Sequence, residues 1–278
     1  MNDLSLPSRD LVLIGAGHTN LHVVRMWRMQ PIPDVRLTVI SPFSRATYSG
    51  MLPGTLAGFY QPDDMEIDLY RFSESCGARL IVDEVAGLEP AMRRVLFADR
   101  PPLRYDAASV GIGSVPGQRE IWARNPQVLS IKPMATFRKR FAQKLSELPA
   151  AKRAEVVIVG AGAGGVEVAF GLDVWLRKSG IDAQISLIDA NREILADYSP
   201  GTIGRARREL ARRGISLSVG RRVSEITATS RAIVRFDDGS SITADLVIWA
   251  TAAAAPPVLA NFRLPKTDDG FLEVAPTL

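Results

Sequence analysis

The chain has 278 residues, 46% hydrophobic and 23% charged, enough to build a sizeable core over one large or two ordinary domains. Its net charge of +4 and isoelectric point of about 9.4 suit anionic ligands, but no basic patch is interleaved with aromatics, which argues against a nucleic-acid-binding protein. The single cysteine, Cys76, excludes an intrachain disulfide framework and a Cys-x-x-Cys redox pair. The N-terminus is polar and no apolar run reaches about 18 residues, so we expect a cytoplasmic protein without a membrane span.

The first elements of the chain are predicted to be a strand, a tight glycine turn and a helix. The apolar run LVLI at residues 11–14 stops at Gly-Ala-Gly, and a helix-like stretch covers residues 18–29. A second apolar strand follows at residues 36–41. This strand-helix-strand order favours a parallel sheet with a helical crossover.

The same order of elements returns in the second half of the chain. The run VVIVGAG at residues 156–162 precedes a helical stretch at 163–178 and a strand at 183–189. Residues 84–116 and 222–257 are also alike, because each holds short alternating strands joined by turn residues and ends in an apolar strand. We therefore predict an α/β fold with two Rossmann-like dinucleotide-binding domains, each with a parallel sheet and a small antiparallel meander.

The repeat suggests where the domains begin and end. We expect a first domain over residues 1–115, to which residues 268–278 return, and a second domain over residues 151–267. Residues 116–150 are expected to form a linker with an amphipathic helix. The apolar side of that helix is formed by residues at i, i+4 and i+8, namely Phe137, Phe141 and Leu145.

The second copy carries a complete Gly-x-Gly-x-x-Gly fingerprint in Gly160, Gly162 and Gly165. Such a turn places a pyrophosphate at a helix N-terminus, where free N–H groups and the helix dipole attract negative charge. Asp189, at the end of the second strand, is placed to bind both ribose hydroxyls and to repel a 2′-phosphate, which favours NADH over NADPH. Arg192 lies close in the sequence and would soften that preference.

The first copy keeps Gly15 and Gly17 but has Asn20 at the third glycine position. The two retained glycines serve the tight turn and the close approach of phosphate, whereas the third serves helix–strand packing. Asn20 is therefore expected to widen that contact without abolishing binding. The second strand ends in Ser41, so the charged ribose ligand is absent from this copy.

Two sequence motifs resemble one known family. LIGAGHTNLHVVRMW, with RLTVISPFSRATYSGMLPGTLAGFY, resembles the first dinucleotide-binding unit of the pyridine nucleotide-disulfide oxidoreductase superfamily, and VVIVGAGAGGVEVAFGL resembles its NADH-binding turn. The resemblance covers nearly the whole chain. It is closest to type II NADH dehydrogenase-like flavoproteins, which include the domain found fused to selenide, water dikinase.

The resemblance implies FAD on the first unit and NAD(P)H, with NADH preferred, on the second. It places Pro53, within residues 48–54, beside the isoalloxazine, and it places Glu167 near the meeting point of nicotinamide and flavin as a catalytic candidate. The cofactor-binding candidates are Gly15, Gly17, His18, Ser41, Pro53, Gly113, Gly160, Gly162, Gly165, Asp189 and Thr251. No metal site is predicted, because His18 and His22 have no further ligands in the sequence pattern.

The implied activity is an FAD-dependent NAD(P)H oxidoreductase of the non-disulfide type, which passes a hydride from NADH to flavin and then to a small acceptor such as a quinone. The alternative is a non-catalytic or truncated NAD(H)- or FAD-binding module that acts as a sensor or partner domain. The family's second FAD motif would follow residues 270–278, so we expect either a truncated or a naturally short chain.

Interaction partners are only weakly indicated by the sequence. We expect a small-molecule electron acceptor and no nucleic acid. The arginine-rich residues 205–214 are expected to form a solvated helix face, with a peripheral contact to the inner membrane as the alternative. The sequence leaves open whether the chain forms a homodimer.

Overall fold

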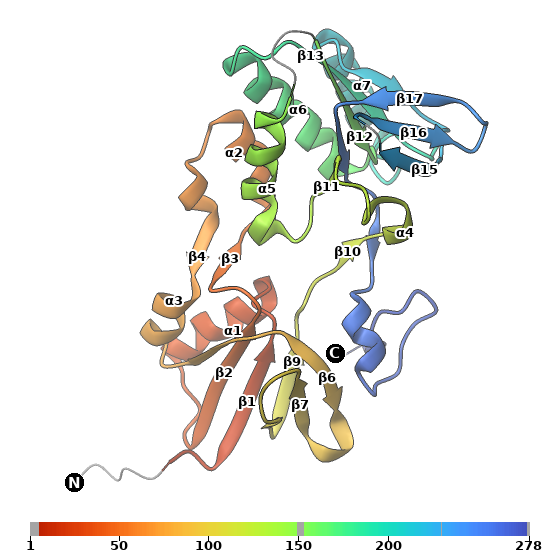
Figure 1. The fold of residues 1–278 in the computed structure, drawn as a ribbon. Helices are drawn as coiled ribbons and strands as arrows, with labels where there is room; N and C mark the ends of the chain where they lie inside the picture. The colour runs from red at the N-terminus through yellow and green to blue at the C-terminus, as the bar shows by residue number, and fades with distance from the viewer. Residues whose placement is uncertain (1–5, 149–152, 229, 277–278) are drawn as a thin grey trace. The chain divides into compact units, whose positions relative to one another are not determined.

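The computed structural model describes residues 6–148, 153–228 and 230–276, and the chain divides into two compact units. Unit 1 contains the residues up to Thr47, Glu66–Val115 and the residues from Ala254 on. Unit 2 contains Tyr48–Met65 and Pro116–Ala253. Each unit is therefore built from segments that lie far apart in the sequence, as the colours in Figure 1 show.

The core of unit 1 is a four-stranded parallel sheet in the order β5-β2-β1-β9. Its strands are β1 (Arg9–Ile14), β2 (Val35–Ser41), β5 (Arg79–Val82) and β9 (Ala107–Val110). Helix α1 (His18–Met29) has the predicted bounds and connects β1 to β2, and α3 (Leu69–Ser75) precedes β5. Val24 and Trp27 of α1 are buried with strand residues of this sheet, so α1 covers one of its faces.

The other face of this sheet is packed by a small antiparallel meander. The meander consists of β6 (Val85–Glu89), β7 (Arg94–Phe97) and β8 (Leu103–Arg104). The segment after Ala254 adds the short helix η4 (Pro257–Asn261) and the fully buried Phe262, which lies in the same hydrophobic cluster as Leu88 of β6. The remaining short elements of unit 1 are β3 (Arg45–Thr47), β4 (Glu66–Asp68) and η3 (Pro90–Met92).

Unit 2 repeats this plan with a five-stranded parallel sheet in the order β11-β18-β12-β13-β14. Its strands are β11 (Val128–Ser130), β12 (Ala154–Val159), β13 (Ala183–Ile188), β14 (Ser216–Ser218) and β18 (Leu246–Trp249). An antiparallel meander of β15 (Val223–Ala228), β16 (Ala232–Phe236) and β17 (Ser241–Ala244) precedes β18, and Figure 1 shows it in blue. Both predicted meanders are thereby confirmed.

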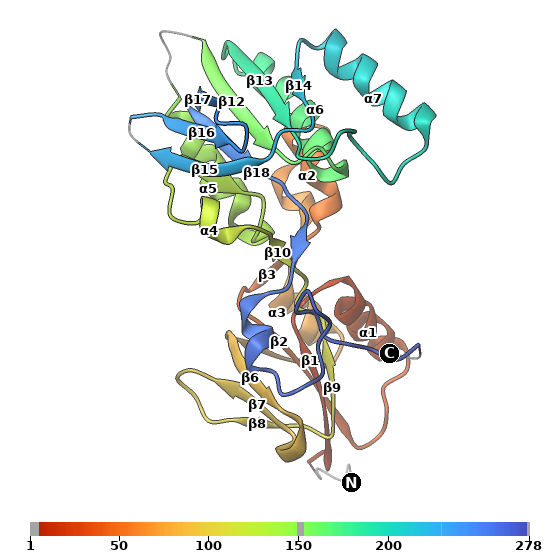
Figure 2. The same ribbon diagram turned by 90° about the vertical axis from the view of Figure 1, so that its right-hand side faces the viewer.

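The helices of unit 2 are α4 (Arg119–Trp122), α5 (Met134–Ser146), α6 (Ala163–Lys178) and α7 (Pro200–Arg212), and Figure 2 labels all four. Helix α6 has the predicted bounds. In α5 the predicted apolar positions are buried in the largest hydrophobic cluster of the unit, where Phe141 also contacts the ring of Trp175. In α7 only Ala206 and Leu210 are buried, so most of its arginines face solvent or form ion pairs.

Residues Tyr48–Met65 belong to unit 2 although they lie within the first half of the chain. They form η1 (Ser49–Met51), α2 (Leu52–Ala57) and η2 (Pro62–Met65). Helix α2 buries Leu52 and Leu56 against α6, and Gly171 of α6 makes the contact close, because a Cβ there would lie 2.7 Å from the carbonyl oxygen of Pro53.

The compact units differ from the expected domain ranges in three ways, each caused by apolar packing. Residues 48–65, expected in the first domain, pack on α6 of unit 2. Residues 116–150, expected as a linker, supply β11 and α5 to the sheet and core of unit 2. The return to unit 1 begins at Ala254 rather than at residue 268, because Phe262 is buried in the core of unit 1. Two of the places where the chain passes from one unit to the other are β10 (Val115–Pro116) and β19 (Ala253–Ala254).

A repeated polar corner supports the internal duplication. In unit 1 the Asp106 carboxylate accepts a hydrogen bond from the backbone N–H of Asp10 at 2.7 Å and lies 3.8 Å from Arg93. In unit 2 the Asp245 carboxylate accepts one from the N–H of Glu155 at 2.9 Å and forms a two-bond ion pair with Arg231. Both aspartates precede the last strand of their sheet and tie it to the strand that leads into the glycine turn, β1 in unit 1 and β12 in unit 2.

Within the described residues, no helix is both long enough and apolar enough to span a membrane.

Candidate functional site

The glycine turn of unit 2 joins β12 to α6. Gly160 has a φ of +107°, and a Cβ there would overlap the carbonyl oxygen of Ala250, so only glycine fits. Gly165 closes the helix onto the strand, because a Cβ at that position would overlap the carbonyl oxygen of Gly160. Gly162 is the N-cap of α6, where no side chain accepts from the helix N–H groups and no atom lies within 4 Å of a Cβ. The turn therefore leaves open space at a helix N-terminus, as pyrophosphate binding requires.

The turn of unit 1 matches that of unit 2 at its first glycine and is more crowded at its second. Gly15 has a φ of +90°, and a Cβ there would overlap the carbonyl oxygen of Gly111, the residue after β9. Gly17 is the N-cap of α1, again without a side-chain cap, and its Cβ would lie 2.8 Å from that same carbonyl oxygen. Both turns thus present an uncapped helix N-terminus at the carboxyl edge of a parallel sheet, which is where open α/β sheets bind ligands.

Asn20 takes the place of the third glycine in unit 1 and is fully buried. Its side-chain N–H₂ group donates to the carbonyl oxygens of Ile14 at 3.1 Å and Gly15 at 2.8 Å. Its side-chain oxygen accepts from the hydroxyl of Ser109, on β9, at 2.8 Å. The amide therefore fills the gap between helix and strand with hydrogen bonds, and it lies beneath the turn, away from the uncapped N–H groups.

The residues that end the β-α-β second strand of each unit, Ser41 and Asp189, differ in their hydrogen-bond partners. Asp189 is buried and accepts from the N–H of Ala161, inside the glycine turn, at 2.5 Å and from the N–H of Asn191 at 2.7 Å. Ser41 is equally buried, and its hydroxyl interacts with the N–H and carbonyl of Phe43. Both residues shape the loop that follows their strand, but only Asp189 also binds the turn.

The remaining candidates lie at several places around the sheet edges. Gly113, three residues after β9, has a φ of +75° with no atom near its Cβ position. The hydroxyl of Thr251, two residues after β18, is buried and has no hydrogen-bond partner among the described residues. His18 is the exposed first residue of α1, and Glu167 is exposed on α6. Pro53 lies in α2 and so in unit 2, whereas Gly15, Gly17, His18, Ser41 and Gly113 lie in unit 1.

These turns fit the cofactors that the glycine pattern implies. Gly17 and Gly162 each start a long helix with N–H groups that no side chain caps, which suits the pyrophosphate of a dinucleotide. In unit 2 the unpaired Thr251 hydroxyl adds a hydrogen-bonding group at the same sheet edge. Sequence reasoning missed the hydrogen bond from Asn20 to Ser109, since nothing local connects residues 89 positions apart.

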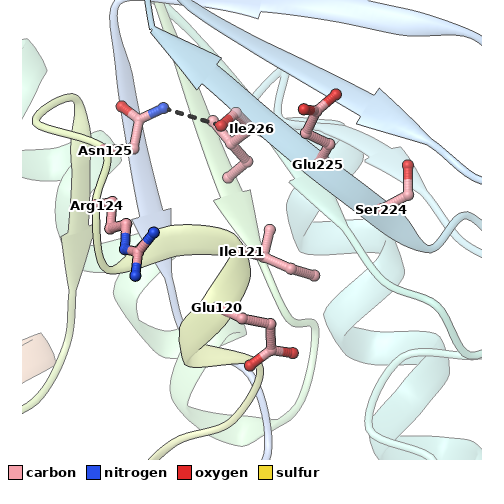
Figure 3. A pocket seen from close by; sticks show the side chains of 7 residues that line it. All are labelled: Glu120, Ile121, Arg124, Asn125, Ser224, Glu225 and Ile226. Carbon is pink, nitrogen blue, oxygen red and sulfur yellow. Dashed lines mark hydrogen bonds between the residues drawn. The ribbon is translucent and has the colours of Figure 1, made fainter.

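Unit 2 also has a pocket of about 500 Å³, and no residue of its glycine turn lines it. It is formed by α4 and the following loop on one side and β15 on the other, and Figure 3 shows its lining. Ile121 and Ile226 supply its apolar surface, and Asn125 donates to the carbonyl oxygen of Ile226 at 3.3 Å. Among the residues described, no three His, Cys, Asp or Glu side chains are placed to hold a metal ion. Cys76 is buried.

Known proteins resemble this chain along most of its length. NADH dehydrogenase-like protein YutJ of Bacillus subtilis is 28% identical over 279 residues, which cover 96% of this chain and 72% of YutJ. Demethylphylloquinone reductase NdbB of Synechocystis is 32% identical over 135 residues, which cover 48% of this chain and 33% of NdbB.

Solved structures share the fold. The water-forming NADH oxidase of Lactobacillus brevis, bound to NADH, superposes with a TM-score of 0.78 at 19% identity over 94% of this chain and 58% of that one. NDH2 of Plasmodium falciparum, in complex with NADH, superposes with a TM-score of 0.76 at 16% identity over 92% of this chain and 58% of that one. The chain thus spans somewhat more than half the length of these structures.

A family model, that of pyridine nucleotide-disulphide oxidoreductases, matches residues 9–278. Members of this family bind FAD and NAD(P)H, in agreement with the two uncapped glycine turns. The chain belongs to the pyridine nucleotide-disulphide oxidoreductase family, and its relatives are NAD(P)H-dependent flavin oxidoreductases of the NADH dehydrogenase-like kind.

Proposed function

We propose that the chain is an FAD-dependent NAD(P)H dehydrogenase of the non-disulfide type, which takes a hydride from NADH and delivers electrons to a small acceptor such as a quinone. The observation that supports it best is the pair of glycine turns, one per unit, each at an uncapped helix N-terminus. A single dinucleotide site would serve a sensor, whereas two such sites provide for a donor and a flavin.

In unit 2 the residues of the turn bind and orient the nicotinamide dinucleotide. The N–H groups at the start of α6 face the pyrophosphate, and the absence of a side chain at Gly162 leaves room for it. Asp189 holds the N–H of Ala161 and so keeps the turn in its binding shape. The Thr251 hydroxyl, buried without a partner, is available to a polar group of the ligand.

In unit 1 the matching residues hold the flavin dinucleotide by its pyrophosphate. Gly15 and Gly17 allow the backbone to turn against Gly111, and Asn20 fastens the start of α1 to β9 through Ser109. FAD, when bound, supplies the redox chemistry by accepting two electrons as a hydride and releasing them to an acceptor. Serine at position 41 leaves the adenosine ribose with neutral hydrogen-bonding partners.

No side chain of this protein is assigned as an acid or a base, because the bound cofactors would supply the hydride chemistry themselves. Glu167 is exposed on α6, so its proposed place near the nicotinamide is a role in orientation. The only cysteine, Cys76, is buried in unit 1 beneath α1, which leaves no cysteine pair to relay electrons. A quinone acceptor is supported by the likeness to NdbB, a demethylphylloquinone reductase.

The test is the absorbance of the purified, FAD-loaded protein near 450 nm under anaerobic conditions. NADH is expected to bleach this band, and a quinone analogue is expected to restore it faster than oxygen does. A protein that retains no FAD, or whose flavin stays oxidised with excess NADH, contradicts the dehydrogenase. If NADH bleaches the band rapidly but a quinone analogue restores it no faster than oxygen does, only the proposed quinone acceptor is contradicted.

Gly162→Asp provides a sharper version of the same test. The new carboxylate enters open space at the start of α6 and repels pyrophosphate, so bleaching by NADH is expected to slow by at least about 100-fold while FAD content is unchanged. Gly201→Asp is the matched control, since it adds an acid to the first turn of α7, where the nearest atom to a Cβ is Oγ of Ser199 at 4.0 Å. Equal slowing in both variants would mean that the effect is not specific to the turn.

A further inference from the structure

The pocket between α4 and β15 of unit 2 contains none of the residues assigned above to a cofactor. Its volume of about 500 Å³ is typical of small-molecule sites. One wall owes its shape to a β-bulge, because the register of β15 with β16 shifts between Val223 and Glu225. As a result two consecutive residues, Ser224 and Glu225, are both exposed and both line the pocket.

Hydrogen bonds and apolar contacts fix the shape of this pocket. The side-chain N–H₂ group of Asn125 donates to the carbonyl oxygen of Ile226 at 3.3 Å, and its side-chain oxygen accepts from the N–H of Gln127 at 3.0 Å. Ile121 and Ile226 pack into the same hydrophobic cluster beneath the meander. The loop after α4 is therefore tied to β15, and the pocket has an apolar floor.

The same place in unit 1 is filled by the protein itself. Strand β6 has a matching bulge, and there the segment that ends η4 covers it, since the side chain of Asn261 donates to a carbonyl oxygen of β6 at 3.0 Å. The fully buried Phe262 pairs with β6, and a Cβ on Gly87 would lie 3.2 Å from the carbonyl oxygen of Asn261. Glu225 follows the bulge of β15 as Gly87 follows that of β6. Unit 2 thus leaves open a space that unit 1 closes.

Two opposite charges at this pocket are not used by the protein. Among the residues that the structure describes, the carboxylate of Glu120 and the guanidinium of Arg124 form no ion pair or hydrogen bond. The short α4 ends before Arg124, so the helical spacing that pairs residues four apart is not continued. Figure 3 shows the two side chains on different sides of Ile121. The carboxylate of Glu225 points away from Ile121 and pairs with Arg235 at 3.3 Å.

We propose that this pocket binds a small zwitterion with an aliphatic body, of the kind that an apolar amino acid provides. Arg124 binds the carboxylate of the ligand and Glu120 binds its ammonium group, each through charge-assisted hydrogen bonds. Ile121 and Ile226 contact its aliphatic part. A zwitterion satisfies both free charges, whereas an anion faces the like charge of Glu120 and a cation that of Arg124. The site is separate from the proposed dehydrogenase activity.

Leucine and two of its derivatives test the site by calorimetric titration of the full chain. Leucinamide lacks the carboxylate and N-acetyl-leucine lacks the ammonium group, so each is expected to bind about tenfold or more weakly than leucine, the effect of one lost charge-assisted contact. Tryptophan fluorescence is a second readout, because Trp122 follows Ile121 and shares the carbonyl oxygen of Gly117 with Trp249, at 2.9 and 3.0 Å.

Two variants assign the charges to their partners. Arg124→Gln is expected to remove the preference for leucine over leucinamide, and Glu120→Gln the preference for leucine over N-acetyl-leucine. Arg119→Gln is the matched control, because Arg119 is an exposed arginine of α4 that does not line the pocket. It is expected to change no binding constant, and far-ultraviolet circular dichroism checks that every variant is folded.

Three outcomes overturn the site. They are no binding of leucine up to about 10 mM, equal affinity for leucine and both derivatives, and equal weakening of leucine by R119Q and R124Q. None of them affects the proposed dehydrogenase, which the bleaching of the flavin by NADH tests separately.

Discussion

The two glycine turns solve one packing problem in different ways. In unit 2 the first turn of α6 comes so close to the strand that only Gly165 fits above the carbonyl of Gly160. In unit 1 the equivalent residue, Asn20, is a buried amide that donates to the carbonyl of Gly15 and accepts from Ser109. The difference teaches that another residue can replace the third glycine without changing the start of the helix, because Gly17 and Gly162 are both N-caps without a side-chain cap.

The ends of the second strands show a related contrast. Asp189 binds the glycine turn of its own unit as well as the loop that follows, whereas Ser41 binds only the loop. Unit 2 therefore stabilises its turn with a carboxylate from the neighbouring strand, and unit 1 stabilises its turn with an amide from the helix. In both, a buried polar side chain fixes a backbone that glycine leaves free.

The largest expected effect comes from adding a side chain at Gly165, where helix α6 lies closest to the preceding strand. Gly165→Ala places a methyl group on the carbonyl oxygen of Gly160, so the helix must move off the sheet, at a cost of about 3 kcal/mol or more of unfolding free energy. Urea denaturation of the two-unit chain, followed by circular dichroism, measures it. Gly164→Ala is the control, since its Cβ meets open space and alanine favours the helix by about 1 kcal/mol. Similar losses in both variants would show that the close approach is not the cause.

The next effect tests whether the glycine can be restored in unit 1. Asn20→Gly completes the fingerprint, yet it leaves the Ser109 hydroxyl and two buried carbonyl groups without their amide partner. We expect a loss of about 2 kcal/mol and weaker FAD retention. Denaturation and the FAD dissociation constant measure these changes, and Ser109→Ala is expected to reproduce a smaller part of the loss. A more stable N20G protein would contradict the role given to Asn20.

Sequence reasoning found the repeat and both turns because their signals are local. An apolar strand, a glycine turn and a helix lie within about 20 residues, and α1 and α6 occur with the expected bounds. It did not find that β11 joins the sheet of unit 2 or that α2 packs on α6, where Gly171 meets Pro53. Those contacts join residues more than 100 positions apart, and no periodicity within a segment reveals them.

At the candidate site, too, only the features with local sequence signals could be predicted. The glycines were predicted from spacing, because a positive φ restricts the residue type at Gly15 and Gly160 and a close carbonyl restricts it at Gly165. The commitments of Asp189 to the backbone, and of Asn20 to Ser109, depend on which strands are neighbours.

The repeated aspartate corner provides a third comparison between the two units. The side chain of Asp245 is buried and accepts two hydrogen bonds from Arg231. The side chain of Asp106 is about half exposed and lies farther from Arg93. Asp245→Asn is expected to cost about 2 kcal/mol of unfolding free energy and Asp106→Asn about 0.5 kcal/mol. Paired denaturation curves measure the difference. Equal losses would indicate that the shared backbone bond, rather than the ion pair, carries the corner.

The smallest expected effect is a difference between the two units in how a glutamate substitution changes the melting temperature at low pH. In unit 2 the guanidinium groups of Arg212 and Arg213 lower the pKa of Glu209 to about 2, from an ordinary value of 4.5. Because the folded-state pKa is depressed, this carboxylate stabilises the fold above pH 4.5, and the contribution disappears as the pH falls towards 2. Glu209→Gln is therefore expected to lower the melting temperature slightly at pH 7, with a gap to the parent that narrows between pH 4.5 and 2. Glu74→Gln, at an exposed glutamate of α3 in unit 1, is expected to show no such gap. A gap that is the same at pH 7 and pH 3 would mean that Glu209 acts through packing and not through its charge.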